Sequence, residues 1–305
     1  MNMAQKRVLA IHDISCIGRC SLTVALPIIS AAGVECAVLP TAVLSTHTGG
    51  FTGFTYRDLT DDLKPIVDHW KTLGLKFDYI YTGFLGSFEQ IDIVIDIIDA
   101  LRGRDTKVVV DPVMADNGEL YGVFPPDFPK GMRKLCRKAD LILPNITEAS
   151  LLAGTEYSAG RHSVEFVEDA LERLGSVCPG EVVLTGVNFD RGTIRSAASG
   201  SGRGSVYVAA DSDADSYLGA AARDAKKKIS YAFHPLIPGF YHGTGDVFGS
   251  ALVASFANGK TLQRATEIAV DYTSGSIERT REAGTDVRFG VNFEAGLRKF
   301  SEDVR

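Results

Sequence analysis

The sequence has little of what marks secreted or membrane-spanning proteins. It contains five cysteines, an odd number in 305 residues, so we expect reduced thiols rather than a disulfide framework. The first apolar run, residues 8–11, is too short for the apolar region of a signal peptide. The longest apolar-looking stretch, residues 22–39, is interrupted by Pro27, Gly33 and Glu35, so it does not indicate a membrane span. The sequence therefore predicts a cytoplasmic protein with no membrane partner.

Positive charge is also scarce. There are 32 Lys and Arg residues against 38 Asp and Glu residues, which gives a formal net charge of −6. Nucleic-acid binding needs clustered cations that displace counterions from phosphates, so we expect no nucleic-acid partner. The one basic cluster, Lys226–Lys228, follows an acidic stretch and is interpreted as a solvated loop.

What the sequence does contain is an alternation of short β-rich runs and segments of helical period. This alternation is typical of an α/β fold with a mainly parallel central sheet flanked by helices. Several of the runs are apolar at every position, as strands covered on both faces must be. The predicted strands are 7–12, 35–40, 79–82, 107–111, 141–144 and 182–185. The predicted helices lie around residues 22–29, 63–70, 91–98, 164–174, 247–257 and 265–279.

The alternation of strand and helix patterns is interrupted between residues 188 and 239. Residues 193–197 and 206–209 are predicted to form hairpin strands around a Gly/Ser-rich turn at 200–205, and residues 229–233 another strand. We interpret this region as a small antiparallel edge with a mobile loop. No linker rich in Pro, Gly or polar residues divides the chain, so we expect a single domain over residues 1–305.

The strongest local signal is the run Gly243-Thr244-Gly245-Asp246, which precedes a predicted helix. Its glycines allow a sharp turn that leaves backbone N–H groups free at the helix N-terminus, where an anion such as phosphate binds well. Asp246 would then lie beside that phosphate and could take a proton from an attacking hydroxyl group. Alternatively, Asp246 only complements the helix dipole. The four residues alone leave both interpretations open.

Polar residues also follow two apolar runs farther back in the chain. Asp111 ends one predicted strand, and Asn145 and Glu148 follow the next. Ligands collect at the carboxyl ends of parallel strands, so Asp111 and Glu148 could hold Mg²⁺ through water molecules. The alternatives are a helix cap for Asn145 and a turn role for Asp111.

A third set follows the first two predicted strands. Ser15 comes after the first strand, and His47 and Thr48 come after the second. Their hydroxyl and imidazole groups suit the polar edge of a small aromatic ring. Single serines or histidines in loops carry little meaning, so the prediction depends on their shared position at strand ends.

Taken together, these motifs resemble the pyridoxal kinase family within the ribokinase-like small-molecule kinases. The resemblance covers nearly the whole chain. It rests on segments 11–21 (IHDISCIGRCS), 44–50 (LSTHTGG), 81–90 (YTGFLGSFEQ), 111–121 (DPVMADNGELY), 144–148 (PNITE), 183–186 (VLTG) and 243–246 (GTGD).

The resemblance implies a three-layer ribokinase-like sandwich that catalyses ATP-dependent phosphorylation of the 5′-hydroxymethyl group of pyridoxal. It extends this activity to pyridoxine and pyridoxamine, with pyridoxal 5′-phosphate as the product from pyridoxal. Asp246 matches the catalytic base of the family. Gly243, Thr244 and Gly245 match the anion hole that faces the transferred phosphoryl group.

The remaining site residues carry over in two groups. Asn145, Glu148 and Thr185 match the nucleotide and Mg²⁺ side, with Asp111 nearby. The family also implies Mg²⁺ with ATP, a K⁺ ion and a homodimer. Water must be kept from a poised γ-phosphate, so we expect two lids, at residues 49–60 and 210–228.

On the substrate side, Ser15, His47 and Thr48 match the pocket around the pyridine ring, and Phe84 falls where the family often has an aromatic residue. The sequence departs from the familiar family pattern around Ser15, and Phe84 lacks the hydroxyl group of the tyrosine in many relatives. These differences concern the choice of ring substrate. The alternatives are a hydroxymethylpyrimidine kinase of thiamin synthesis and a non-catalytic ligand-binding protein on the same fold.

Overall fold

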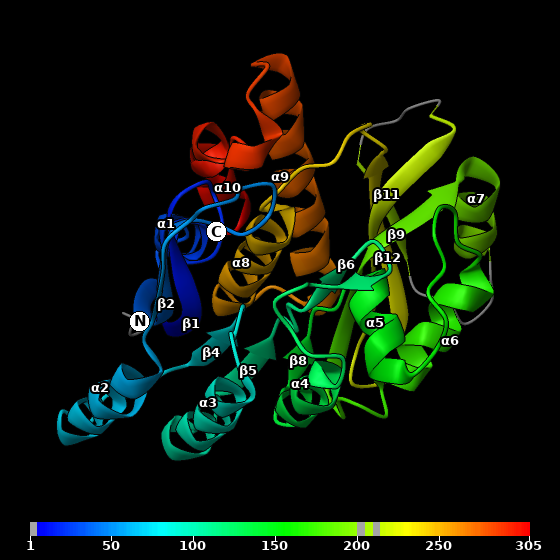
Figure 1. The fold of residues 1–305 in the computed structure, drawn as a ribbon. Coiled ribbons are helices and arrows are strands. Elements are labelled where there is room, and N and C mark those ends of the chain that lie inside the picture. Colours follow the sequence, from blue (N-terminus) through cyan, green and yellow to red (C-terminus); the bar gives the residue numbers. More distant parts are fainter. Residues whose placement is uncertain (1–4, 200–204, 210–213) are drawn as a thin grey trace.

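The computed structural model describes residues 5–199, 205–209 and 214–305. Across these residues, ten strands form one sheet in the order β10-β12-β11-β9-β8-β5-β4-β1-β2-β3, and a two-stranded hairpin, β6-β7, stands apart (Figure 1). The strands of the large sheet are β1 (Arg7–Ile17), β2 (Glu35–Thr46), β3 (Tyr56–Asp58), β4 (Tyr79–Thr82), β5 (Lys107–Val110), β8 (Leu141–Ile142), β9 (Glu181–Asp190), β10 (Val206–Val208), β11 (Ser216–Arg223) and β12 (Ile229–Pro235). The hairpin comprises β6 (Ala115–Asp116) and β7 (Glu119–Leu120).

The centre of the sheet is parallel, as predicted. Each neighbouring pair from β9 through β8, β5, β4 and β1 to β2 runs in the same direction. Antiparallel pairs occur toward the edges, where β3 joins β2 and where β11 lies between β9 and β12. The carboxyl ends of the parallel strands therefore meet at one edge of the sheet, which is where ligands bind in open α/β sheets.

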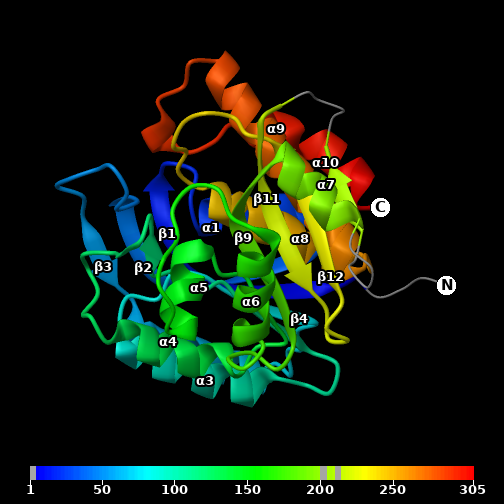
Figure 2. The ribbon, with the colours of Figure 1, turned by 90° about the vertical axis from the view of Figure 1, so that its right-hand side faces the viewer.

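Helices cover both faces of the sheet and form two hydrophobic cores, which confirms the three-layer prediction. One core joins the sheet to α2–α6, and the other joins its opposite face to α1, α8, α9 and α10. Figure 2 shows α5 and α6 in front of the strands and α8 behind them. The helices are α1 (Leu22–Ala31), α2 (Thr60–Thr72), α3 (Phe88–Leu101), α4 (Phe128–Cys136), α5 (Ile146–Ala153), α6 (Val164–Leu174), α7 (Arg191–Ser199), α8 (Thr244–Ala257), α9 (Leu262–Glu282) and α10 (Leu297–Asp303), with short 3-10 turns η1 (Val287–Phe289) and η2 (Glu294–Gly296). No described helix has the length and apolar character needed to span a lipid bilayer.

One predicted hairpin strand is wrong. Residues 193–197 lie in helix α7, because the Asp190 side chain accepts a hydrogen bond from the backbone N–H of Thr193 at 2.7 Å and so caps the start of that helix. The partner strand exists as β10, but it pairs in parallel with β12 rather than with residues 193–197. Most of the predicted turn, residues 200–204, lies outside the described residues.

The predicted mobile lid at residues 210–228 is also wrong where the structure describes it. Residues 216–223 form strand β11, which pairs with β9 along its whole length and with β12 over residues 217–223. Residues 210–213 lie outside the described residues. In the other predicted lid, residues 56–58 form edge strand β3, which pairs with β2.

Strands β1, β2 and β9 extend well beyond their predicted ends, and helices α4, α5, α7 and α10 were not predicted. Strands β1 and β2 continue to Ile17 and Thr46, so both reach well beyond the neighbouring β4. Helices α4 and α5 pack against the same core as α3 and α6. These extensions and helices supply much of the polar edge described next.

Candidate active site

The glycine-rich turn before α8 is held tightly against a second loop. Gly243 caps the helix with φ 75°, in the left-handed region that favours glycine. A Cβ atom at this position would lie 2.0 Å from the carbonyl oxygen of Arg19, so no side chain fits there. No side chain caps the helix start, which leaves its first N–H groups available to an anion.

Asp246 lies in the first turn of α8, as predicted. Burial, together with the negative charge of Asp13, raises the pKa of its carboxyl group from 3.8 to about 7, although a hydrogen bond from the backbone N–H of Ser21 opposes the shift. A carboxylate whose pKa lies near neutrality is suited to accept a proton from an alcohol at physiological pH.

Asp13, on β1, is a site residue that the sequence reasoning did not assign. Its side chain is only 4% exposed, and it accepts hydrogen bonds from the Ser21 hydroxyl group at 2.5 Å and from the Ser15 hydroxyl group at 3.1 Å. Ser15 is therefore fully buried and directed at Asp13. No local pattern marked Asp13, which directly follows the predicted strand 7–12.

Both ring nitrogens of His47 are engaged by the backbone. Its Nε2 lies 2.6 Å from the carbonyl oxygen of Arg288, and its Nδ1 accepts the N–H of Gly49 at 3.1 Å. The Nε2 nitrogen must therefore carry the proton, and burial lowers the pKa of the ring. The adjacent Thr48 is exposed. His47 therefore has no free ring nitrogen to offer to a ligand.

Phe84 and Tyr56 both lie close to Gly86. Phe84 is partly buried and packs against Phe124 with ring centroids 5.5 Å apart. A Cβ atom on Gly86 would lie 2.7 Å from the hydroxyl oxygen of Tyr56 and 3.9 Å from the ring of Phe84. Tyr56, on β3, was not predicted as a site residue. It places a phenol group beside Phe84, which lacks one.

The predicted pair of acidic residues at the next strand ends is also brought together. Strands β5 and β8 are parallel neighbours, and both Asp111 and Glu148 are buried. Burial and the charge of Glu148 raise the pKa of Asp111, and burial raises the pKa of Glu148 to about 8. Two buried carboxylates that disfavour each other's ionisation are a favourable place for a cation.

Asn145 caps helix α5, as the alternative interpretation proposed. Its side-chain oxygen accepts the backbone N–H of Glu148 at 2.9 Å, and the Glu148 carboxylate accepts the backbone N–H of Asn145 at 2.9 Å. The same carboxylate accepts the N–H of Met114 at 3.1 Å. Thr185 lies beside Asn145 in an isolated parallel bridge, so Asn145, Glu148 and Thr185 form one cluster.

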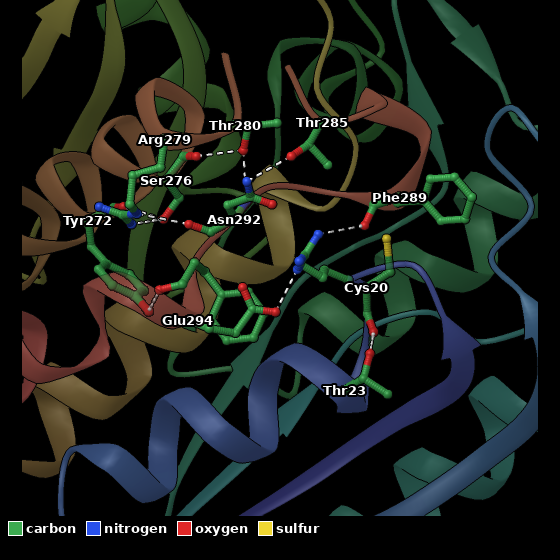
Figure 3. A network of polar contacts seen from close by, with 12 residues as sticks. Cys20, Thr23, Tyr272, Ser276, Arg279, Thr280, Thr285, Phe289, Asn292 and Glu294 are labelled. Carbon is green, nitrogen blue, oxygen red and sulfur yellow. Dashed lines mark hydrogen bonds and ion pairs between the residues drawn. The ribbon is translucent and has the colours of Figure 1, made fainter. Parts of the chain in front are cut away.

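A polar network from the C-terminal part of the chain anchors the loop between β1 and α1 (Figure 3). The Arg19 side chain pairs with Glu294 at 2.5 Å, and the Arg19 backbone N–H donates to the carbonyl oxygen of Phe289 at 3.0 Å. Thr23 donates to the carbonyl oxygen of Cys20 at 2.8 Å. The loop that holds Ser21 against Asp13 and Asp246 is thus fixed on one side by residues 289–294 and on the other by Gly243.

The comparisons with known proteins agree with this arrangement. A family model described as phosphomethylpyrimidine kinase matches residues 26–290. The pyridoxal kinase of Ovis aries is 29% identical over 81% of this chain and 77% of its own length. A provisionally assigned phosphomethylpyrimidine kinase of Bacteroides thetaiotaomicron, crystallised with pyridoxal, is 35% identical with a TM-score of 0.84, covering 97% of this chain and 96% of its own. The pyridoxal kinase of Lactobacillus plantarum is 28% identical with a TM-score of 0.81, covering 97% of both chains.

The fold and the glycine-rich turn define a small-molecule kinase of the ribokinase-like class. The chain belongs to the phosphomethylpyrimidine kinase family and, within it, to the pyridoxal kinases and their relatives, as the sequence motifs predicted.

Proposed function

We propose that the protein is an ATP-dependent kinase that phosphorylates the 5′-hydroxymethyl group of pyridoxal and also accepts pyridoxine and pyridoxamine. The observation that carries this proposal is the position of Asp246, a carboxylate with a pKa of about 7 beside the open N-terminus of α8. Relatives named pyridoxal kinase, and a structural neighbour crystallised with pyridoxal, support the choice of substrate.

In this proposal Asp246 accepts the proton of the substrate hydroxyl group while the hydroxyl oxygen attacks the γ-phosphorus of ATP. The bond between the γ-phosphorus and the bridging oxygen breaks, and ADP leaves. The transferred phosphoryl group carries its charge on its peripheral oxygens, so the protein contributes mainly alignment and fixed positive potential. The backbone N–H groups of Gly243, Thr244 and Gly245 supply that potential from the helix N-terminus. Ser15, His47, Thr48 and Phe84 line the ring side.

The nucleotide side suits Mg²⁺ that arrives with ATP. Asp111 and Glu148 offer carboxylate oxygens, the ligands that Mg²⁺ prefers, and a cation would relieve the cost of burying both charges. Within the described ranges no three His, Cys, Asp or Glu residues form a complete metal cluster, which fits an ion held jointly with phosphates and water. When bound, the ion neutralises charge on the phosphates. Asn145 and Thr185 lie beside this pair and complete the nucleotide side.

The proposal also covers nucleotide binding, a monovalent cation, the oligomeric state, the location and the domain organisation of the enzyme. Relatives solved with ADP support nucleotide binding by this fold. We extend the proposal to a K⁺ requirement and a homodimer, which the family resemblance implies, and to a cytoplasmic location, which the short and interrupted apolar runs of the sequence predict. We also keep residues 1–305 as one catalytic domain, because one sheet runs through the described chain.

A second candidate function is phosphorylation of a hydroxymethylpyrimidine. The description of the matching family model and the provisional assignment of the Bacteroides thetaiotaomicron neighbour favour it. The two candidates share the phosphoryl-transfer residues and differ only in the ring that the pocket accepts.

The test is ADP release from Mg-ATP with pyridoxal, pyridoxine, pyridoxamine and hydroxymethylpyrimidine offered separately at equal concentration. We expect turnover with the three B6 vitamers and at least tenfold less with the pyrimidine. Turnover with the pyrimidine alone would select the second candidate. No turnover with any acceptor, in protein that binds ATP, would favour the non-catalytic alternative.

A further inference from the structure

The Asp13 carboxylate is buried without a cation. It is 4% exposed, and within residues 5–199, 205–209 and 214–305 no lysine, arginine or histidine forms an ion pair with it. The hydroxyl groups of Ser15 and Ser21 use two of its acceptor positions, whereas an ionised carboxylate offers about four. An isolated buried charge is costly, and two neutral hydroxyl donors compensate it only in part.

Ser21 joins this carboxylate to the catalytic base. The Ser21 hydroxyl group donates to Asp13, and the Ser21 backbone N–H donates to Asp246. The backbone of Ser21 has φ 56° and ψ −132°, a conformation that residues other than glycine rarely adopt. The structure thus holds a strained residue in place, and that residue fixes the positions of both carboxylates.

Asp13 also faces the groups expected to surround the substrate. Its charge affects the pKa of Asp246 on α8, His47 at the end of β2, Tyr56 on β3 and Cys20 before α1. Of these groups only His47 can become cationic, and its Nε2 hydrogen is directed at a backbone carbonyl. Burial raises the pKa of Asp13, so a positive charge that would keep its carboxylate ionised has to come from a bound ligand.

We infer that Asp13 binds the ring nitrogen of the B6 vitamer in its protonated, pyridinium form by accepting the ring N–H. This inference rests on the proposed function. In a B6 vitamer a single ring CH separates the nitrogen from the carbon that bears the 5′-hydroxymethyl group. Groups that bind the nitrogen and deprotonate the hydroxyl group must therefore be neighbours, and Asp13 and Asp246 are neighbours joined by Ser21. The ring cation supplies the charge that the buried carboxylate lacks.

The test is a pH titration of pyridoxine bound without ATP, followed by its near-ultraviolet absorbance, which reports protonation of the ring nitrogen. In wild-type protein we expect the pKa of the ring nitrogen to rise by about 1–3 pH units above its value in free pyridoxine, because an opposite charge stabilises the protonated ring. Asp13→Asn should return it to the free value and weaken pyridoxine binding about tenfold or more. The matched control is Asp303→Asn, which changes an exposed carboxylate on α10 and should behave as wild type.

Two results would overturn the inference. One is a ring pKa in the wild-type complex that equals the value in solution. The other is a raised ring pKa that persists in Asp13→Asn, which would leave Asp13 with the structural role of holding Ser15 and Ser21. Circular dichroism shows whether Asp13→Asn is folded. If the variant does not fold, the titration of the wild-type complex still shows whether the pKa of the ring nitrogen is raised on binding. Failure of wild-type protein to phosphorylate any B6 vitamer would instead overturn the proposed function, since the titration needs no turnover.

Discussion

Replacing Asp246 by asparagine should stabilise the folded protein at pH 8 while removing its activity. The wild-type carboxylate is held in surroundings that disfavour its charge, because burial and Asp13 raise its pKa from 3.8 to about 7. Below pH 4 the side chain is protonated in both folded and unfolded protein and carries no such cost. Above pH 7 it is ionised in both states, and folding bears the full cost of burying the charge. The advantage of Asp246→Asn should therefore grow between pH 4 and pH 7 and then level off.

The size of this advantage follows from the shift. A change of roughly 3 pH units corresponds to about 4 kcal/mol of differential stability at about 1.4 kcal/mol per unit. The asparagine amide brings its own burial cost of about 1–3 kcal/mol, since only its oxygen has a ready partner in the Ser21 N–H. We expect a net gain in the free energy of unfolding of roughly 1–3 kcal/mol at pH 8.

The assay is urea unfolding of both proteins at pH 4.5, 6, 7 and 8, in buffer free of Mg²⁺ and nucleotide. Asp92→Asn, the same chemical change at an exposed position on α3, serves as the control and should show no pH-dependent difference from wild type. In parallel, kcat for phosphorylation of pyridoxal should fall about 10²–10⁴-fold in Asp246→Asn. A loss of stability that grows with pH, or a kcat within threefold of wild type, would refute the reasoning.

Three further outcomes follow from the geometry. Asp111→Asn should raise the apparent KM for Mg-ATP while raising the thermal midpoint of the unliganded protein at pH 8, since it removes one of two buried, mutually repelling charges; a lower midpoint would contradict this. Gly243→Ala should lose activity and unfold at lower urea concentration, because the new Cβ meets the Arg19 carbonyl oxygen at 2.0 Å; unchanged kinetics would remove the turn from the mechanism. Asn145→Ala should cost about 1 kcal/mol in urea unfolding through loss of the α5 cap, and unaltered stability would show that the cap is dispensable.

The parallel half of the fold could be predicted from sequence because its strands are apolar on both faces. The run Val108–Val110 indicates a buried strand without reference to any neighbour. Strand β11 gives no such signal, since Gly219 and Ala220–Ala222 have low β propensity. The small residues of β11 are explained by its close packing against β12. A Cβ on Gly219 would lie 2.0 Å from the carbonyl oxygen of Ala232 on β12. That requirement depends on tertiary packing.

The candidate site likewise contains some residues that local sequence identifies and others that only tertiary contacts identify. Gly243–Asp246 and the capping box of Asn145 and Glu148 are local in sequence, so spacing alone could identify them. Asp13 and Tyr56 could not be identified as site residues from local pattern. Their importance comes from contacts with Ser21 and Gly86, which follow only when the loop before α1 and the edge strand β3 are folded into place.

The central claim is that the site built around Asp246 transfers a phosphoryl group from ATP to the hydroxymethyl oxygen of pyridoxal. The most direct measurement is mass spectrometry of the products after wild-type protein and Asp246→Asn are each incubated with pyridoxal and Mg-ATP. The account predicts pyridoxal 5′-phosphate and ADP in equal amounts from the wild type, and at least 100-fold less of both from the variant. ADP without phosphorylated pyridoxal, or equal product from the two proteins, would contradict it.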